Sequence, residues 1–364
     1  MRASLLSPFP NWRLWVPGAL LAFVASRALL VMVASVVGQP PLDGISDGWA
    51  GGVVPPVFAA WDTKYYIGIA KEGYHLQPDG AGYHDWAFFP ALPILMRVVS
   101  SVMGGDFALA GVVIANCALL AGLLLSGIVI AEHEDPGATT TAQALIALGP
   151  GAVAFGLAYS DSLAFAASAG MYLAARYRGR WIAGLLFALA TLTRPSGILL
   201  GVPLAILFWE EFDRREARAT LRVFAPLALG PLALLGFAAF QGVALGDPLA
   251  FLHAQADWSR LSTRSEAPFL SAILTGTFAV YSVAAVLLLR SKLPRAAKAV
   301  GLMAYITVLV PGRLLSNARF MALGWPIPWM LARQGRVGRL AAIALSTCGF
   351  LLYAVLNLSQ HLPP

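Results

Sequence analysis

The stretch that decides the fold is residues 107–131, which read FALAGVVIANCALLAGLLLSGIVIA. It has no charged side chain and exceeds the ~20 residues that a helix needs to cross a bilayer. Similar apolar runs lie at 14–37, 139–158, 160–177, 181–193, 196–209, 222–244, 270–289, 297–311, 319–332 and 339–357. Of the 364 residues, 59% are hydrophobic and 12% charged, against ~45–50% and ~25% in soluble domains. The sequence predicts an all-α, multi-pass membrane protein forming one domain over residues 1–364.

Basic residues gather in four clusters between these runs, and the clusters set the expected orientation. They lie at 176–180, 214–222, 290–298 and 333–339. Because basic loops stay in the cytoplasm, the segments 156–161, 193–197, 245–268 and 311–318 are expected outside it. With Arg2 and Arg13 inside, the chain is expected to cross the inner membrane of the cell about eleven times. The N-terminus is then cytoplasmic and the C-terminus external.

Two segments need separate treatment. Residues 14–37 exceed the ~7–15-residue apolar core of a removable leader, so we expect them to remain as a spanning helix. Phe88–Gly104 is short, and a crossing there would invert every later loop. It also carries Arg97, which is costly at the centre of a bilayer. We therefore expect an interfacial or re-entrant helix within a first outer loop of 38–106, and a second outer loop at 245–268.

The first outer loop carries the best candidate for an acid–base group. Trp61, Tyr65 and Ile69 recur every four residues, as one face of a helix would. Asp62 then lies near the start of that helix at the membrane surface, where its carboxylate can act as a general base toward a hydroxyl group. The alternative is that the aspartate caps the helix or is simply solvated.

Other polar residues on the outer side are candidates for substrate contacts. They are His84 before an aromatic corner, Asp161 in the tetrad 159–162, and Trp258 in the helix expected after Gly246. An acid among apolar spans is a functional candidate, and a tryptophan can stack on a sugar. Each residue also has a simpler interpretation, as a polar residue that flanks or connects helices.

Three arginines lie on the outer side, against the positive-inside rule. Arg194, Arg313 and Arg319 have no carboxylate neighbour in the sequence. Because guanidinium groups bind phosphate oxygens bidentately, the three predict a site for the phosphate of a donor, with Lys64 as a further candidate cation. The alternative is that these side chains extend to lipid headgroups, as arginines near helix ends can do.

Several chemistries find no support in the sequence. It has no Walker loop, dinucleotide fingerprint, zinc-protease helix motif or Gly-x-Ser-x-Gly elbow. We expect no cofactor, and a divalent metal has no dense set of carboxylates to support it. The net charge of +7 is explained by basic loops, so no nucleic-acid partner is expected.

Six short motifs, in order, resemble bacterial members of the PIG-V-like mannosyltransferase family. They are Trp61-Asp62…Gly73-Tyr74, Ala87-Phe88-Phe89-Pro90…Arg97, Tyr159-Ser160-Asp161-Ser162, Thr193-Arg194-Pro195-Ser196-Gly197, Gly246-Asp247-Pro248…Trp258 and Ser316…Arg319-Phe320. The resemblance runs over about residues 14–335 and implies a GT-C glycosyltransferase with a polyprenyl- or dolichyl-phosphate donor, usually of mannose. The family tetrad is often Tyr-Ser-Glu-Ser, so Asp161 keeps the charge with a shorter reach.

The resemblance also implies roles for residues of the first outer loop. The family has an acidic residue at the active site in this loop, and it corresponds to Asp62. Trp61, Tyr66 and Tyr74 are then expected to contact substrate, and the acceptor is expected to be a lipid-linked glycan or another group outside the cytoplasm. The reaction would be a single displacement with inversion. A transporter of lipid-linked or small substrates and a non-catalytic scaffold, which would not need Asp62, are the alternatives.

Overall fold

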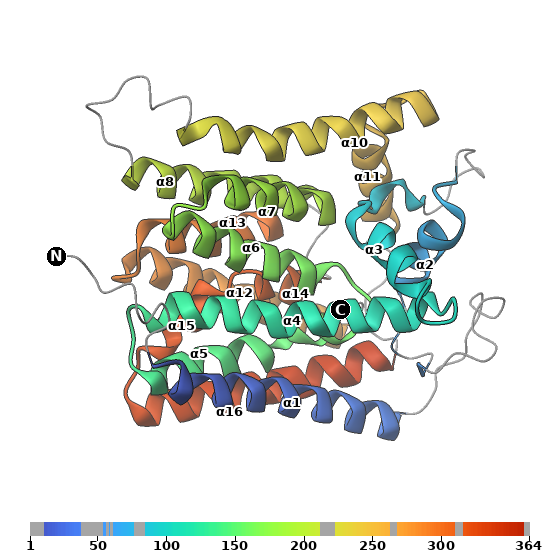
Figure 1. The fold of residues 1–364 in the computed structure, drawn as a ribbon. Helices are drawn as coiled ribbons and strands as arrows, with labels where there is room; N and C mark the ends of the chain where they lie inside the picture. The colour runs from blue at the N-terminus through green and yellow to red at the C-terminus, as the bar shows by residue number, and fades with distance from the viewer. Residues whose placement is uncertain are drawn as a thin grey trace.

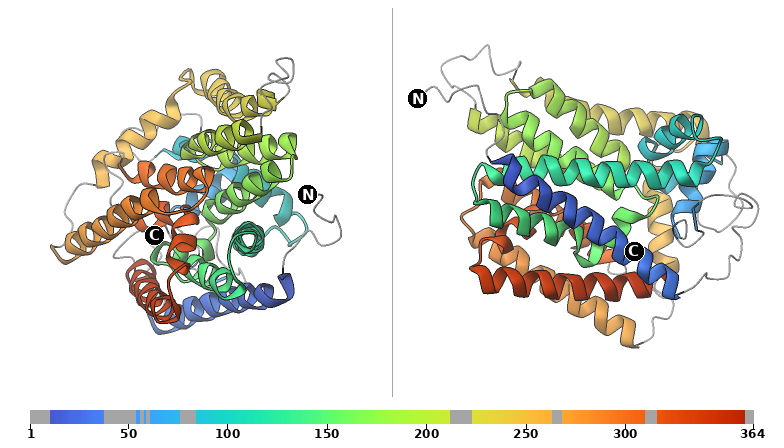
Figure 2. Two further views of the ribbon diagram at one scale, coloured as in Figure 1. Left: turned by 90° about the vertical axis from the view of Figure 1, so that its left-hand side faces the viewer. Right: turned by 60° about the horizontal axis from the view of Figure 1, so that its bottom comes forward.

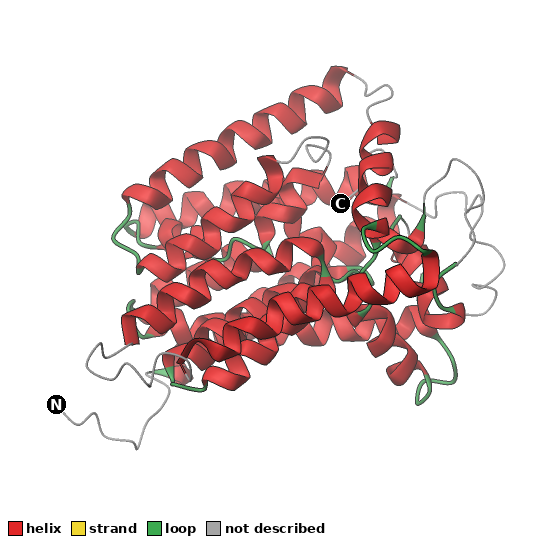
Figure 3. Ribbon diagram, turned by 90° about the horizontal axis from the view of Figure 1, so that it is seen from above, coloured by secondary structure: helices red, strands yellow, loops and turns green. Residues whose placement is uncertain are grey.

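The computed structural model describes residues 11–37, 54–55, 58, 61–75, 84–211, 223–262, 268–309 and 316–359. All regular structure within these ranges is helical (Figures 1 and 3). The longer helices lie along one common direction, and several short helices close one end of the bundle (Figure 1). The expected all-α membrane fold is thus confirmed. Arg313 lies outside the described ranges.

Five helices are long and apolar enough to cross a membrane, by length and composition within the described ranges. They are α1 (Trp12–Val37), α4 (Phe107–Ala131), Ala225–Leu245 with η5 (Ala225–Ala228) and α10 (Leu229–Leu245), α12 (Pro268–Arg290) and α16 (Arg336–Leu358). A sixth span would be the pair α5 (Pro136–Ala147) and η3 (Pro150–Gly156), which is bent by 72°.

The other apolar runs form shorter helices, so the count of eleven crossings stays a prediction. α6 (Asp161–Arg176), α7 (Arg180–Thr193) and α13 (Arg295–Leu309) have 16, 14 and 15 residues. Helices of this length span about 22 Å, less than the ~30 Å hydrocarbon core. Two runs are divided in two: η4 (Pro195–Leu200) with α8 (Gly201–Glu211), and α14 (Asn317–Ala322) with α15 (Pro326–Ala332).

Prolines begin the segments that follow two of the helix breaks. Pro150 opens η3 and Pro195 opens η4, positions where the missing N–H of proline costs nothing. The runs 181–193 and 196–209 are short for two crossings, and the sequence predicts half-helices broken at Arg194-Pro195; the structure has this break. Gly151 in η3 lies directly against α14, because a Cβ at this glycine would collide with the carbonyl group of Ala318. η3 therefore supports the backbone of the short helix α14.

Short helices form a cap at one end of the bundle. The cap consists of α2 (Thr63–Glu72), η2 (Asp85–Ala87), α3 (Ala91–Ser100) and α11 (Ala250–Ser262) (Figures 1 and 2). α3 has ten residues, about 15 Å, so it is too short for a crossing, in agreement with the expectation for 88–104. Arg97 donates from Nε to the Ala70 carbonyl at 2.6 Å and so caps the end of α2.

The cap is joined to the bundle through α10. The side-chain amide of Gln241 donates to the Trp86 carbonyl at 3.0 Å and accepts from the backbone N–H of Phe251 at 2.9 Å. The rings of Phe89, Phe237 and Phe251 pack together beside it. These contacts fix η2 and α11 on the end of α10.

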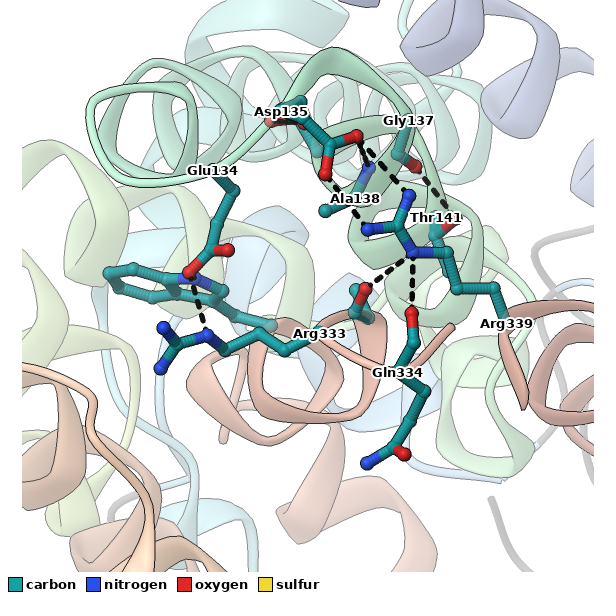
Figure 4. Close-up of polar contacts among 11 residues, drawn as sticks. Glu134, Asp135, Gly137, Ala138, Thr141, Arg333, Gln334 and Arg339 are labelled. Carbon is teal, nitrogen blue, oxygen red and sulfur yellow. Dashed lines mark hydrogen bonds and ion pairs between the residues drawn. The ribbon is translucent and has the colours of Figure 1, made fainter. Parts of the chain in front are cut away.

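Basic loops gather at the end of the bundle opposite the cap. Two of the four basic clusters pair with the acidic turn 132–135 between α4 and α5. Arg176 pairs with Glu132, and Figure 4 shows the pairs Arg333–Glu134 and Arg339–Asp135. The turn between α12 and α13 lies at the same end (Figure 1). The cluster 214–222 lies outside the described ranges. The structure thus separates basic loops from predicted outer segments, and which end faces the cytoplasm stays a prediction.

Candidate active site

Asp62 directs its carboxylate toward the bundle. It precedes α2, but its side chain makes no capping hydrogen bond, so the capping alternative is wrong. Its Oδ2 instead accepts a hydrogen bond from Nη1 of Arg319 at 2.6 Å. The backbone N–H of Asp62 donates to the hydroxyl group of Tyr159 at 3.2 Å. Asp62 therefore stands at the junction of the cap and the bundle.

The turn that places Asp62 has an unusual backbone conformation. Trp61 has a φ of 60°, a left-handed conformation that costs a non-glycine residue about 1–2 kcal/mol. The indole Nε1 of Trp61 donates to the carbonyl of Asn357, near the end of α16, at 3.3 Å. This bond helps to hold the turn, and strained residues often occur at functional sites.

Four residues form a chain of alternating charge, which we call the ion-pair chain. It begins with Asp62 bound to Arg319. Nε of Arg319 donates to Oδ2 of Asp161 at 2.8 Å, and Nη1 of Arg194 donates to Oδ1 of Asp161 at 2.5 Å. Asp161 opens α6, Arg194 precedes η4, and Arg319 lies in α14. The helix breaks therefore bring three distant segments together beneath the cap.

Burial within the ion-pair chain is lowest at Asp62. The side chain of Asp161 is 0% exposed, those of Arg194 and Arg319 are 8% and 9% exposed, and that of Asp62 is 21% exposed. Buried charges are tolerated when they are paired, and two carboxylates balance two guanidinium groups here. Asp62 is the carboxylate of the chain that a molecule at the cap can reach.

Aromatic side chains surround the ion-pair chain. The guanidinium carbon of Arg319 lies 4.5 Å from the ring centroid of Tyr159, and that of Arg194 lies 4.6 Å from the ring of Phe320. Tyr66 Oη lies 2.9 Å from Ser160 Oγ, and burial raises the pKa of Tyr66 to about 12. Tyr66 is thus protonated at neutral pH, and Asp62 is the accessible carboxylate of the ion-pair chain.

The two described arginines that were expected to meet a phosphate are already paired with carboxylates. That expectation rested on the lack of an acidic neighbour in sequence, but Asp161 is 33 residues from Arg194 and 158 from Arg319. A phosphate can therefore bind these guanidinium groups only by sharing or replacing a carboxylate. Lys64 is exposed on α2, with its ammonium group 5.1 Å from the ring of Tyr65.

The other expected substrate residues divide between the site and the cap. Trp61 and Tyr66 border the ion-pair chain. Tyr74 does not: its hydroxyl donates to the Phe88 carbonyl at 2.8 Å and its ring packs on Phe237, so it serves the packing of the cap. The ring of His84 stacks on that of Trp86, 4.4 Å between centroids. Trp258 lies on α11, and its side chain is outside the described part of the structure.

Sequence reasoning missed the supporting residues of the site. Tyr159 and Ser160 stand in the tetrad that was singled out for Asp161, so the polar run between two apolar helices was the available signal. Nothing in the sequence pointed to Asn357. Within the described ranges, no group of three or more His, Cys, Asp or Glu side chains is placed to hold a metal ion.

The fold defines a class of membrane protein. The structure is similar to crystal structures of the oligosaccharyltransferase of Archaeoglobus fulgidus. For the complex with Zn and sulfate the TM-score is 0.51 and the sequence identity 15%, and the match covers 93% of this chain and 53% of the oligosaccharyltransferase chain. For the apo form the TM-score is 0.51 and the identity 14%, and the match covers 94% of this chain and 55% of the other. Identity this low shows the fold alone. The chain is a multi-pass helical membrane protein with the GT-C type of fold.

Sequence comparison identifies the family within that class. The family described as Mannosyltransferase (PIG-V) matches residues 45–262, which include Asp62, Asp161 and Arg194. GPI mannosyltransferase 2 of Chaetomium globosum is 27% identical over 277 residues, covering 64% of this chain and 57% of the relative. GPI alpha-1,6-mannosyltransferase 2 of Cricetulus griseus is 28% identical over 170 residues, covering 43% and 32%. The alignments thus span little more than half of one relative and a third of the other. This chain belongs to the PIG-V mannosyltransferase family.

Proposed function

We propose that this chain is a membrane mannosyltransferase with a polyprenyl-phosphate sugar as donor and Asp62 as general base. Membership of the family supports transfer of mannose. The observation that carries the proposal is the position of Asp62, the most exposed member of the ion-pair chain, whose carboxylate is oriented by Arg319 at the junction of the cap and the bundle. The acceptor is a hydroxyl group of a glycan or glycolipid at the membrane surface, on the external side.

The reaction is a single displacement at the anomeric carbon. The acceptor hydroxyl gives its proton to the carboxylate of Asp62, and its oxygen forms the new bond to the sugar. The bond between the anomeric carbon and the phosphate oxygen breaks, and its electron pair leaves with the polyprenyl phosphate. The leaving group departs ionised, so no general acid is required, and attack from the opposite face inverts the anomeric centre.

Cationic side chains near Asp62 support the departure of the phosphate. As the bond breaks, the phosphate gains one negative charge, and a preorganised cation stabilises the transition state more than the ground state. Arg319 is held by Asp161 on one side and reaches Asp62 on the other. Lys64 is the exposed cation two residues from Asp62. Arg194 contributes by pairing with the same fully buried carboxylate as Arg319.

A transfer assay with radiolabelled polyprenyl-phosphate mannose tests this proposal. The chain is reconstituted in proteoliposomes, and product formation is compared for wild type and Asp62→Asn, which keeps the size of the side chain but cannot accept the proton. General-base catalysis contributes ~10²–10⁴-fold, so turnover should fall by about that factor. Asp135→Asn is the matched control, because Asp135 lies at the opposite end, is 58% exposed and can be replaced as a helix cap by asparagine.

Two outcomes would contradict the proposal. If Asp62→Asn keeps near-normal transfer while Asp161→Asn abolishes it, the base is misassigned. If wild type incorporates no label while it carries the intact donor across the vesicle membrane, the chain is a transporter.

A further inference from the structure

Arg319 binds its two carboxylate partners through different edges of its guanidinium group. Nε, which we call the inner edge, donates to Asp161 at 2.8 Å, and that carboxylate is 0% exposed. Nη1, the outer edge, donates to Asp62 at 2.6 Å, and that carboxylate is 21% exposed. Because the guanidinium group is planar and rigid, each edge can bind one carboxylate or one phosphate without disturbing the other edge.

We propose that the outer edge of Arg319 exchanges Asp62 for the phosphate of the donor, while the inner edge stays on Asp161. Asp62 is then released to accept the acceptor proton only when the donor is bound. The inference rests on the proposed function, because it assigns the order of events at the same site. Asp161 becomes a positioning residue, which acts by holding Arg319 through the exchange.

The charges of the site require that an anion takes the place of Asp62. Arg194 and Arg319 both pair with Asp161, so without Asp62 the chain would hold two cations and one anion in a buried place. An uncompensated buried charge is strongly unfavourable. A phosphodiester, which carries one negative charge, restores the balance at the outer edge. A neutral sugar or alcohol cannot do so, and therefore cannot release Asp62.

The movement of charge during the reaction fits the same exchange. Asp62 loses its negative charge when it accepts the proton, and the leaving phosphate gains one when the sugar bond breaks. Both changes occur beside the outer edge, so Arg319 stabilises the new charge without having to move. A base that is ion-paired until the donor arrives also cannot activate an acceptor or a water molecule too early.

Asp161 is well supported as a fixed anchor. Its second oxygen accepts from Arg194, and the rings of Tyr159 and Phe320 lie beside the two guanidinium groups. The backbone of α14 cannot shift toward η3, because Ala318 already lies against Gly151. The inner edge of Arg319 is thus held on several sides, and the partly exposed Asp62 is the partner that can leave.

Equilibrium binding of a polyprenyl monophosphate to the purified full chain in zwitterionic vesicles tests the exchange. Asp62 competes with the phosphate in wild type, and asparagine competes much less, so Asp62→Asn should bind the probe about tenfold tighter or more. The gain should vanish when Arg319→Gln is added, because the outer edge is then gone. Asp135→Asn should bind like wild type, and polyprenol, which lacks the phosphate, should show no gain in any variant.

The results separate this inference from the proposed function. If Asp62→Asn loses transfer but binds polyprenyl phosphate no tighter than wild type, the exchange is wrong while the general base stands. An equal gain with polyprenol, or a gain that persists with Arg319→Gln, also overturns it. If inorganic phosphate binds as tightly as the polyprenyl phosphate, the ligand is free phosphate and exchange with a lipid donor is excluded. Asp62→Ala repeats the test should the asparagine variant fold poorly.

Discussion

The two ends of the bundle hold the same kinds of charged residue in opposite surroundings. Beneath the cap, Asp161 is 0% exposed and is shared by two buried arginines. At the other end, Arg339 binds both carboxylate oxygens of Asp135, at 3.2 and 2.9 Å, but Asp135 is 58% exposed (Figure 4). Arg333 and Glu134 pair nearby at 3.1 Å.

The difference shows that burial, more than residue type, decides what an ion pair does. An exposed pair contributes little, because water and salt screen it. A buried pair is costly to assemble and more costly to break, because the remaining partner has no solvent. The Arg339–Asp135 pair joins two loops, whereas the ion-pair chain holds buried side chains in fixed positions.

Access from outside the cell should differ completely between the two ends. In a background with Cys117 and Cys348 replaced by alanine, Lys71→Cys on α2 should react with a membrane-impermeant maleimide in intact cells. Lys292→Cys, between α12 and α13, should react only after lysis. Both lysines are exposed, so burial does not confuse the comparison. The reverse pattern would show that the bundle has the opposite orientation in the membrane, with the site facing the cytoplasm.

Breaking the buried chain should cost far more stability than breaking the exposed pair. Asp161→Asn leaves Arg194 and Arg319 without their shared carboxylate, so we expect a loss of about 3–5 kcal/mol in the free energy of unfolding. Asp135→Asn should lose at most about 1 kcal/mol. Thermal unfolding of the detergent-solubilised variants provides the comparison. Equal melting temperatures for Asp161→Asn and Asp135→Asn would show that burial does not make the ion-pair chain more important for stability than the exposed pair.

Adding one methyl group to a glycine should also reduce stability more at the cap end of the bundle than at the opposite end. Gly151→Ala places a Cβ against the Ala318 carbonyl and displaces the helix that carries Arg319, so we expect about 1–3 kcal/mol of destabilisation and reduced mannose transfer. Gly335→Ala, in open space before α16, should change stability by less than about 0.5 kcal/mol. Normal transfer by the Gly151 variant would mean that α14 tolerates the shift.

The smallest change in stability is expected for the exposed pair Arg339–Asp135, and it depends on pH. The hydrogen bond from Arg339, aided by the backbone N–H of Ala138, lowers the pKa of Asp135 from 3.8 to about 2. The pair therefore stabilises the fold above pH ~3.8, and its contribution disappears as the pH falls through ~2. Arg339→Gln should cost about 0.2–1 kcal/mol more at neutral pH than at the acid limit, where only the bonds from Nε of Arg339 to the carbonyls of Ala332 and Gln334 remain to be lost. A difference that grows in acid would contradict this assignment.

The sequence predicted the fold better than it predicted the pairing within the site. Hydropathy identified the apolar runs, and Pro195 marked a real helix break, because both signals are local. Residues 88–104 were expected not to cross the membrane, and α3 is too short to do so, but the partner of Arg97, the Ala70 carbonyl, could not be foreseen. The pairing of the acidic turn 132–135 with two basic clusters could not be predicted, because the partners are distant in sequence.

The candidate site shows the same limit. Asp62, Asp161, Arg194 and Arg319 were each selected from the sequence, and the structure brings all four together. Their mutual neutralisation was missed, because it depends on three helix breaks meeting at one point. Tyr74 was expected to contact substrate because it stands in one of the family motifs, yet it packs in the cap, because an aromatic residue of a motif can serve packing as well as binding.

Because the protein is synthesised from its N-terminus, the contacts of the ion-pair chain can form only at different times. Arg194 follows Asp161 by 33 residues, so that pair can form early, but Arg319 follows Asp62 by 257 residues and Asn357 follows Trp61 by 296. At ~5–20 residues per second, the ribosome needs on the order of tens of seconds to supply those late partners. During that interval Asp62 lacks Arg319 and the cap lacks its bond to α16. The end that carries the proposed active site is therefore the last to mature, and a nascent chain stalled before α14 should lack the ion pairs of Arg319.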